Sequence, residues 1–565
     1  MNKSDSLITL KNNFIQMKKL YILFISVAIG LVACKKDYLD RSPNAKISED
    51  EVFSDIGNSE LFVNNIYNSV PNMFRTFWPM SSATDETDQS QDQATITADG
   101  ADAGNFNSGF YTPSIFPLRG RWKDYFTQVR RCNIVLANYD KIPEDNNYPE
   151  RKKRLRGEVL TMRAYYYFEL LRAWGGVPLF ESIQNPLGQD PILFKRNSVD
   201  EVVDAILKDL AEAETLLPAN YADRQSEIGR ASKTIVKALR SRLLLYYASP
   251  LFNPTGVSTR WKEAATVSKD ALESAIAAGY KLHPNYSEIF TQFTNPEVIW
   301  GRPAPSAFGD AGIDREMNPT GYIGYARVTV LQELVDDYEL KATGKRPAEP
   351  GSGYDPSHPY RGRDPRFYQS VLYPGSLWKG RKIDPLGMDA AEAGKSATNY
   401  WQRKYLLESV NLINSSGDSP RRWVLMRTAE LYLNYAEAQN EAVGPDQAVY
   451  DAVNAVRRRA GMPDLPIELG REEMRERIRH ERRIELAFEG QRFWDVRRWK
   501  IAEVVDNKTV HGVSLNVAGS DTTYTYPIIE KRNFDKGKHY FLPIPQSEID
   551  KLGGVNAGFN QNPGY

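Results

Sequence analysis

The sequence predicts a mainly α fold, in which tetratricopeptide-like helical hairpins form a scaffold that carries long aromatic-rich loops and little β structure. Apolar residues recur at helical spacing in several long segments, and Gly or Pro closes these segments. The stretches between them are rich in Gly, Pro, Tyr and Trp and lack this periodicity. The 565 residues are 41% hydrophobic and 25% charged, so the chain can bury a large core.

The helical spacing of apolar residues predicts that the scaffold consists of three helical hairpins. The first helix ends at Gly175-Gly176-Val177-Pro178, and Ser198 is the predicted N-cap of its partner. Small residues such as Ala436, Ala438, Ala448 and Ala455 allow close packing of the last pair. The hairpins are 155–174 with the helix after Ser198, 231–248 with 261–278, and 426–443 with 446–460. Their spacing is irregular, so an unrelated bundle of paired helices is the alternative.

Two stretches of the chain, 73–117 and about 295–420, are expected to form long loops. Loops of this length on a helical scaffold are usually either functional or flexible, and the aromatic residues in them favour function. The tail after 510 is expected to contribute a short strand or two around 523–526.

The N-terminus predicts export and a lipid anchor. Met17-Lys18-Lys19, the expected true start, precedes an apolar run over 20–32 that is too short for a comfortable membrane span. The run ends in Leu31-Val32-Ala33-Cys34, which resembles a bacterial lipobox, so we expect Cys34 to be lipidated. The alternative is an ordinary secreted protein with a chance cysteine near the cleavage point. Cys132 lies in an apolar-periodic helix and is expected to be a buried free thiol.

Several classes of function find no support in the sequence. The formal net charge of +0 argues against a nucleic-acid binder. No Gly-x-Ser-x-Gly elbow, P-loop or dinucleotide fingerprint is present, and Ile484 stands where a zinc-protease motif starting at His480-Glu481 needs its second histidine. We therefore predict no catalytic residue, metal site or cofactor. One acidic loop carries carboxylates that could bind calcium, but their spacing does not match that of a known calcium-binding loop. We therefore prefer to interpret it as a solvated polar loop. The acidic residues of that loop are Asp85, Glu86, Asp88 and Asp92.

Four segments resemble one known family. They are 155–180 with the core Arg163-Ala164-Tyr165-Tyr166-Tyr167-Phe168-Glu169-Leu170, 426–461 beginning Met426-Arg427-Thr428-Ala429-Glu430-Leu431, 478–495 with Gly490-Gln491-Arg492-Phe493-Trp494-Asp495, and 541–565 with Phe541-Leu542-Pro543-Ile544-Pro545. In this order, behind a lipobox, they resemble the SusD/RagB family of Bacteroidetes glycan-capture lipoproteins, over nearly the whole mature chain. Within them, the charges at helical spacing are expected to form structural ion pairs, and Phe493, Trp494 and Trp499 to lie in the core. These charges are Arg479, Glu481, Arg482, Glu485, Glu489 and Arg492.

The resemblance implies a division of the chain and a function. The regions would be a signal peptide (1–33), a lipid-anchored segment (34–60), an N-terminal helical region (61–290), a loop-rich variable region forming the ligand face (291–420) and a C-terminal helical region with a tail (421–565). The protein would capture oligosaccharide without catalysis at the cell outer membrane and deliver it to a SusC-like TonB-dependent transporter. The alternatives are a lid for peptide or other non-glycan uptake, a repeat scaffold that binds only proteins, and an all-α carbohydrate-active enzyme.

The ligand-binding residues are expected among aromatic side chains of the loops, because rigid rings cover the C–H face of a sugar at low entropic cost. Polar side chains near them would bind the hydroxyls. At least one tryptophan of the set is expected to be exposed on a concave surface. The candidates are Trp78, Tyr111, Trp300, Tyr322 and Trp378, with Asn107 and Arg302 as hydroxyl partners.

Overall fold

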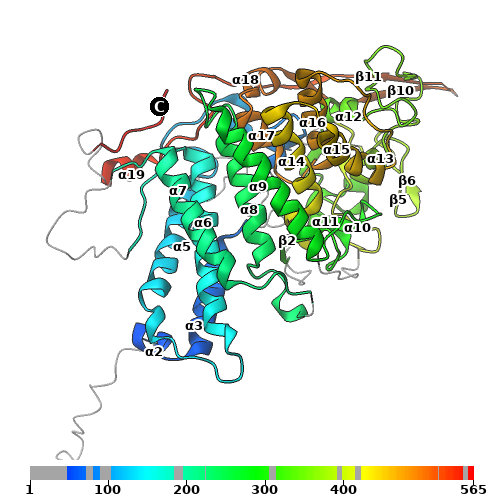
Figure 1. Cartoon of the computed structure of the whole chain (residues 1–565). Helices are drawn as coiled ribbons and strands as arrows, with labels where there is room; N and C mark the ends of the chain where they lie inside the picture. The colour runs from blue at the N-terminus through cyan, green and yellow to red at the C-terminus, as the bar shows by residue number, and fades with distance from the viewer. Residues whose placement is uncertain are drawn as a thin grey trace, which may run out of the picture.

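A row of long antiparallel helices forms the scaffold of the computed structural model (Figure 1). The structure describes residues 48–71, 80–89, 103–182, 195–222, 224–303, 313–390, 398–413, 421–519, 521–551 and 558–565. Consecutive helices of the row pack side by side. From one end to the other, the row consists of α5 (Arg119–Ala137), α6 (Glu150–Trp174), α7 (Val199–Leu216), α8 (Lys233–Ala248), α9 (Ser258–Ala277), α14 (Thr428–Val443), α15 (Gln447–Arg459) and α16 (Arg471–Glu485).

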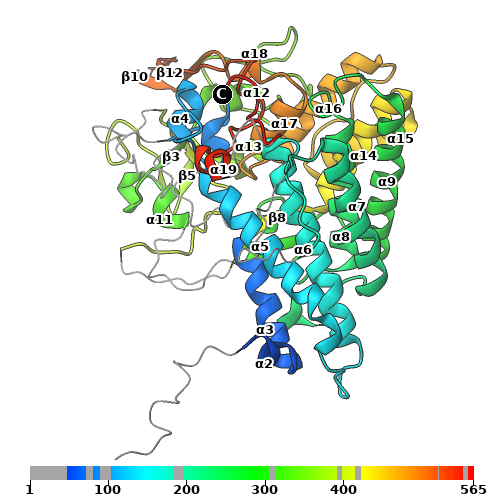
Figure 2. The ribbon, with the colours of Figure 1, turned by 90° about the vertical axis from the view of Figure 1, so that its left-hand side faces the viewer.

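Shorter elements surround the row. Figure 2 shows the long helices α7, α8, α9, α14 and α15 on one side and the loop-rich part, with α11, β3 and β5, on the other. The shorter helices are α2 (Glu49–Phe53), α3 (Ile56–Ile66), α4 (Ala103–Ser108), α10 (Glu288–Thr291), α11 (Ile313–Met317), α12 (Gln332–Asp337), α13 (Pro365–Ser370), α17 (Arg492–Arg498), α18 (Ala502–Val505) and α19 (Gln546–Lys551). The 3₁₀ turns η2 (Tyr67–Ser69), η3 (Met80–Ala83) and η7 (Thr320–Tyr322) also border the sites described below.

The β structure is a set of small antiparallel sheets. One has the strand order β1 (Thr87–Gln89), β3 (Val328–Val330), β7 (Trp401–Gln402) and β4 (Val371–Leu372). The two-stranded pairs are β2 (Val298–Pro303) with β8 (Arg422–Arg427), β5 (Leu377–Trp378) with β6 (Arg381–Lys382), β9 (Thr509–His511) with β12 (Ile528–Lys531), and β10 (Ser514–Ala518) with β11 (Asp521–Thr525). The predicted mainly α fold with little β structure is confirmed, as is the strand near 523–526.

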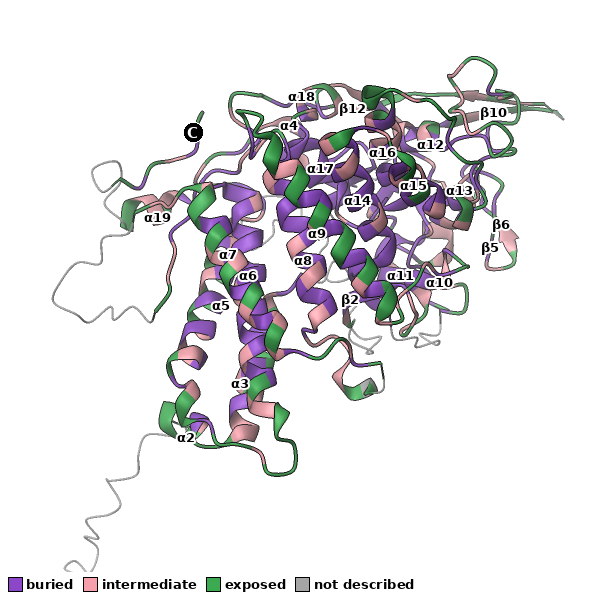
Figure 3. Ribbon diagram, viewed as in Figure 1, coloured by how far each residue is buried: buried purple, intermediate pink, exposed green. Residues whose placement is uncertain are grey.

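The first predicted hairpin is α6 with α7. Gly175 ends α6 with φ 75°, a left-handed conformation that favours glycine, and a Cβ on Gly176 would lie 2.1 Å from the carbonyl oxygen of Asn197. Ser198 caps α7 through a capping box with Glu201, as the sequence predicts. The aromatic run 165–168 of α6 is buried, so this motif serves packing (Figure 3).

The third predicted hairpin begins later than its sequence suggests. Its first helix, α14, starts at Thr428, whereas Met426 and Arg427 belong to strand β8, which pairs with β2. All six residues of β8 are buried, and a short apolar run of this kind cannot be assigned to a helix or a strand by periodicity alone. The other predicted helices lie within a few residues of α8, α9 and α15.

The family-like segments contact one another in pairs, 155–180 with 541–565 and 426–461 with 478–495. The indole of Trp174, at the end of α6, donates a hydrogen bond to the carbonyl oxygen of Pro543 at 2.8 Å, and Asn562 near the C-terminus donates to the carbonyl of Leu542 at 2.7 Å. In the same way Arg482 of α16 donates to Asn434 of α14 at 2.7 Å. These motifs therefore hold distant parts of the chain together.

Candidate functional site

Two of the predicted tryptophan platforms are buried. Trp300 is 2% exposed, donates its indole N–H to the carbonyl of Gly229 at 3.2 Å and packs edge-on against Tyr165. Trp378 is 1% exposed and donates to the side-chain oxygen of Asn318 at 2.8 Å. Neither ring offers a free face for a sugar, so both predictions of a stacking platform are wrong. Large aromatics in loops between helices serve packing at least as often as binding.

Asn107 and Tyr111 are also part of the core. The amide of Asn107 donates to the carbonyl of Ser82 at 3.0 Å, and Tyr111 stacks on His539 with ring centroids 4.6 Å apart. Their assignment as ligand contacts is corrected by this burial. Trp78, the third tryptophan of the set, and the lipidation candidate Cys34 both lie outside the described residues.

Tyr322 is half-buried in a cluster of loops. Its hydroxyl donates to the carbonyl of Trp378 at 2.8 Å, and the guanidinium of Arg381 lies 3.9 Å from its ring centroid. One face of this ring is thus covered by protein. The neighbouring Tyr325 is 37% exposed and lies under the guanidinium of Arg327, 4.8 Å from its centroid.

The structure brings Trp300 and Arg302 together in an open groove of about 270 Å³ along strand β2. We call it the β2 groove. It lies between β2 and the segment formed by α3 and η2, and an edge of the buried Trp300 reaches its wall. Its walls are Asn64, Tyr67, Asn68, Val70, Ile228, Gly229, Arg230, Trp300, Gly301, Arg302 and Pro303.

The β2 groove has the chemistry for a neutral polar ligand. Asn64 and Asn68 are exposed, and Arg302 is half-buried. Amides both donate and accept hydrogen bonds and guanidinium groups donate them, which suits the hydroxyls of a saccharide. Apolar patches from Val70, Ile228 and Pro303 separate these polar groups.

The sequence-based prediction missed the contribution of α3 to this groove. It selected aromatic residues of loops, whereas Asn64 lies on a helix, and Asn68 and Arg230 lie in short turns. Arg230 forms ion pairs with Glu60, at 3.0 Å, and with Glu158, at 3.1 Å. No motif marks these residues, because only the fold brings α3 and β2 to the same groove.

The acidic stretch 85–88 is not a solvated loop. Asp85, Glu86 and Asp88 are all buried, and Asp92 lies outside the described residues. Arg492 donates to Asp85 at 3.0 and 3.1 Å and Arg483 pairs with it too, which lowers the pKa of the Asp85 carboxyl despite its burial. The preferred interpretation of a solvated loop is wrong for these three residues. Asp85 pairs with arginines of α16 and α17, Glu86 accepts a hydrogen bond from the backbone N–H of Phe488 at 3.4 Å, and Asp88 lies 4.0 Å from Arg532.

The charge run of the third motif forms ion pairs, as expected, and those of Glu485 and Glu489 are buried. Arg427 of β8 donates to Glu485 at 2.6 Å and to Glu489 at 2.8 Å, and Lys404 donates to Glu489 at 2.7 Å. Desolvation lowers the pKa of Lys404 to about 8, although Glu489 opposes this shift. Phe493, Trp494 and Trp499 are buried, which confirms their expected place in the core.

Other reactive groups are also accounted for by packing. Cys132 is a buried free thiol, as predicted, and burial raises its pKa well above the usual range. Within the described residues, no group of three or more His, Cys, Asp or Glu side chains is placed to hold a metal ion. In the same part of the chain, no helix combines the length and apolarity needed to cross a membrane.

Two protein-family models match this chain, each over a different part. Residues 37–245 match a model described as "Starch-binding associating with outer membrane", and residues 288–565 match the model of the SusD family. The β2 groove combines residues from both matches, since Asn64 and Asn68 lie in the first and Trp300 and Arg302 in the second.

Individual relatives agree with these models. The chain is 26% identical over 528 residues to "SusD-like protein P38" of Formosa agariphila, covering 87% of this chain and 93% of that protein. A shorter stretch of 137 residues, 24% of this chain and 22% of the relative, is 33% identical to the "Starch-binding protein SusD" of Bacteroides thetaiotaomicron.

Solved structures agree over almost the full length. A SusD-like protein from Bacteroides fragilis superposes with a TM-score of 0.76 at 29% identity, covering 93% of this chain and 100% of that one. A SusD-like carbohydrate binding protein from the same species has a TM-score of 0.71 at 25% identity, covering 88% and 98%. Two family matches that together span most of the sequence, and solved relatives that align with nearly all of it, show that this chain belongs to the SusD family.

Proposed function

We propose that the protein is a non-catalytic glycan-binding lipoprotein that captures oligosaccharide in the β2 groove. The match of both halves of the chain to SusD-family models carries the proposal. The names of relatives as starch-binding and carbohydrate-binding proteins support it. No catalytic family is indicated by the comparisons, and Asp85 and Glu485 are held in ion pairs with arginines.

The groove binds by many weak contacts. Asn64 and Asn68 would exchange hydrogen bonds with sugar hydroxyls, and the guanidinium of Arg302 would donate to ring or hydroxyl oxygens. The groove is open, so water competes for each of these bonds and single-site affinity is expected in the millimolar range, about −4 kcal/mol. Weak binding suits a protein that must release its cargo.

Delivery and anchoring belong to the same proposal. The lipid on Cys34 would tether the protein to the outer membrane, and the cargo would pass unchanged to a SusC-like TonB-dependent transporter. The family model described as associating with the outer membrane supports this location. Mass spectrometry of the mature N-terminus tests the anchor, since an unmodified Cys34 would contradict it.

Calorimetric titration of the mature protein with plant, host and microbial glycans tests the binding step. We expect Arg302→Ala to weaken the best ligand roughly tenfold, because a hydrogen bond to a charged group contributes about 1.5–3 kcal/mol. Asn64→Ala should weaken it several-fold. Arg361→Ala is the matched control, because Arg361 is exposed and does not line the groove.

Each rival function gives a different result in the same experiments. Release of reducing ends from any glycan of the panel would contradict the non-catalytic proposal and favour a carbohydrate-active enzyme. Binding of peptides in place of glycans would favour a lid for non-glycan uptake. Equal affinities for Arg302→Ala and Arg361→Ala would move the glycan site away from the β2 groove.

A further inference from the structure

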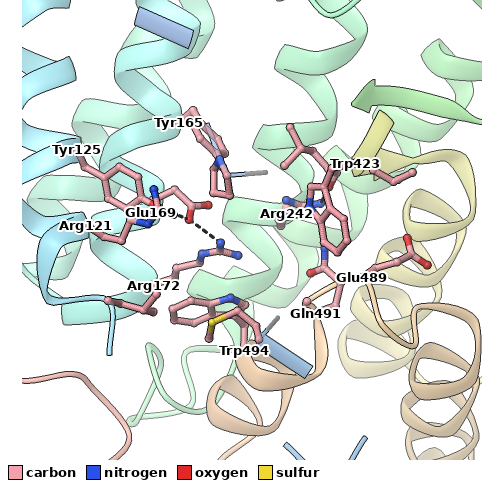
Figure 4. Close-up of a pocket in the computed structure, with 16 residues that line it drawn as sticks. Arg121, Tyr125, Tyr165, Glu169, Arg172, Arg242, Trp423, Glu489, Gln491 and Trp494 are labelled. Atoms are coloured by element: carbon pink, nitrogen blue, oxygen red, sulfur yellow. Dashed lines mark hydrogen bonds and ion pairs between the residues drawn. The ribbon is translucent and has the colours of Figure 1, made fainter. Parts of the chain in front are cut away.

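A second cavity lies inside the scaffold, where α5, α6 and α8 meet β8 and the N-terminus of α17 (Figure 4). It has a volume of about 70 Å³, much less than the β2 groove. In Figure 4, Glu169 and Arg172 approach it from α6, and Trp423 and Gln491 lie opposite them. Arg121 is at its edge, with a side chain that is 30% exposed.

Three buried polar atoms of side chains that line this cavity have no hydrogen-bond partner among the described residues. They are Oε1 of Glu169, Nε of Arg172 and Oε1 of Gln491. Gln491 is 8% exposed, and although it is the residue before the first turn of α17, its side chain makes no capping hydrogen bond. Buried polar groups are almost always hydrogen-bonded, so three in one cavity indicate an occupant that bonds to them.

The charged side chains around the cavity have partners of opposite charge, including Arg121, which lies 3.8 Å from Asp124. Arg172 donates to Oε2 of Glu169 at 2.6 Å, leaving only Oε1 of that carboxylate unpaired. Arg242 forms two hydrogen bonds with Glu430, at 2.7 and 2.6 Å. Glu489 is paired with Lys404 and Arg427. An occupant that carried a net charge would therefore be buried without a counter-ion, at high cost.

The unpaired atoms require both hydrogen-bonding roles from a neutral occupant. It must donate to Oε1 of Glu169 and to Oε1 of Gln491, and accept from Nε of Arg172. A hydroxyl group meets these demands. The aromatic side chains of Tyr125, Tyr165, Trp423 and Trp494 form the rest of the wall and suit C–H groups.

The volume of the cavity limits which molecules could occupy it. A buried water needs about 10–15 Å³ of such volume, so about 70 Å³ holds roughly five water-sized groups. That is the size of a three-carbon polyol and is smaller than a sugar ring. We propose that this cavity is an internal binding site for a small neutral molecule with several hydroxyl groups. The site is separate from the β2 groove and does not depend on the proposed glycan function.

Glycerol is the probe, and Gln491→Met is the variant, because methionine keeps the length of the side chain and removes both hydrogen-bonding roles. Wild type, variant and the control Gln546→Met, at a half-buried position of α19 that does not line this cavity, are titrated with glycerol while thermal unfolding is followed. Glycerol raises the Tm of any protein because it is excluded from the protein surface, and this general effect does not saturate. Binding to the cavity is therefore measured as the part of the Tm increase that saturates at low glycerol concentration. We expect this gain in wild type and control with millimolar midpoints, and a midpoint at least fivefold higher in Gln491→Met.

Crystals of the full mature protein, grown without polyols and then soaked in glycerol, provide the second measurement. Density for one glycerol between Glu169, Arg172 and Gln491 supports the proposal. Overlapping titration curves for wild type and Gln491→Met, or density for separate waters only, overturn it. If Gln491→Met fails to fold, Trp494→Phe replaces it, since the shorter ring removes a wall of the cavity and should weaken glycerol by a similar factor.

Discussion

Glu437 of α14 is completely enclosed by hydrogen-bond donors. Arg498 donates to Oε2 of Glu437 at 2.7 Å and to the other oxygen at 2.5 Å, and the indole of Trp499 donates to Oε1 at 2.7 Å. These partners hold the pKa of the Glu437 carboxyl at about 2 against the effect of its burial. Because both charges were removed from water at a cost, the pair fixes geometry more than it adds net stability.

Removing one partner of this pair should be costly. We expect Glu437→Gln to lower the free energy of unfolding by about 3 kcal/mol, since Arg498 would lose one of its two buried counter-ions and keep only Asp495, at 2.8 Å. Glu476→Gln is the control, because Glu476 is exposed and its ion pair with Arg479, at 3.1 Å, should contribute less than about 1 kcal/mol. Urea unfolding of the two variants measures the difference, and similar losses would contradict the structural role of Glu437.

Sequence-based predictions for single residues are correct where the local pattern determines the environment of the side chain. They are wrong where a partner far away in the sequence determines it. The charges of 479–492 are expected to pair, and they do. Their partners Asp85, Arg366 and Arg427 lie far away in the chain, so no local spacing reveals them. The same limit explains the ligand candidates, because Trp300 and Trp378 are covered by residues from other segments.

At the scale of elements, α6 and α7 approach each other closely at Gly157. A Cβ at this position would lie 2.7 Å from Cγ of Leu217 and 3.0 Å from Cβ of Leu216, at the end of α7. Alanine favours a helix by about 1 kcal/mol over glycine, but a clash with packed side chains costs about 1–3 kcal/mol. The packing term should win, since Gly157 is buried in the middle of α6.

We therefore expect Gly157→Ala to destabilise the protein by about 1–2 kcal/mol, measured as a lower midpoint in urea. Gly57→Ala, in the first turn of α3, is the matched control, because its Cβ would meet only one atom, the N-cap carboxylate oxygen of Asp55 at 3.1 Å, and no packed apolar side chain. That variant should be neutral or slightly stabilising. A stabilising effect of Gly157→Ala would mean that α6 and α7 lie further apart than these distances require.

The sequence predicts the long helices well because an amphipathic helix leaves a period in the sequence. Strand β8 has no such period, since both of its faces are buried, and its last residues read as the start of α14. The packing of α9 against α14 leaves no local signal either, because the loop-rich part of the chain separates them in sequence. This insertion also explains the irregular spacing of the hairpins.

At the scale of the molecule, residues from both ends of the chain share one core. A single cluster of buried side chains runs from Phe53 to Phe559, and the segments of both family matches contribute to it. Such shared burial makes unfolding of either half alone unfavourable. The division of the chain into helical, loop-rich and C-terminal regions stays a prediction.

The shared core also contains carboxyl groups that should make stability depend on pH. Burial raises the pKa of Glu86 to about 7, and that of Asp506, whose carboxylate oxygens lack hydrogen-bond partners within the described residues, to about 6. Both groups bind protons more tightly in the folded state, so the stability they contribute is complete below about pH 4 and lost as the pH rises through 6 and 7. Burial also lowers the pKa of His539 to about 4, which acts in the opposite direction between about pH 4 and 6.5.

The carboxyl groups and His539 change the stability in opposite directions as the pH rises. The difference in free energy of unfolding between wild type and a variant of Glu86 therefore isolates the contribution of Glu86. Glu86→Gln keeps the shape of the side chain and cannot ionise, so relative to wild type it should gain stability on the order of 2 kcal/mol as the pH rises from 5 to 8. Urea unfolding at intervals across this range measures the gain. Glu263→Gln, on the exposed face of α9, should follow wild type at every pH. A constant difference between Glu86→Gln and wild type would mean that Glu86 is ionised throughout, with Arg483 and Arg492 compensating its charge as well as that of Asp85.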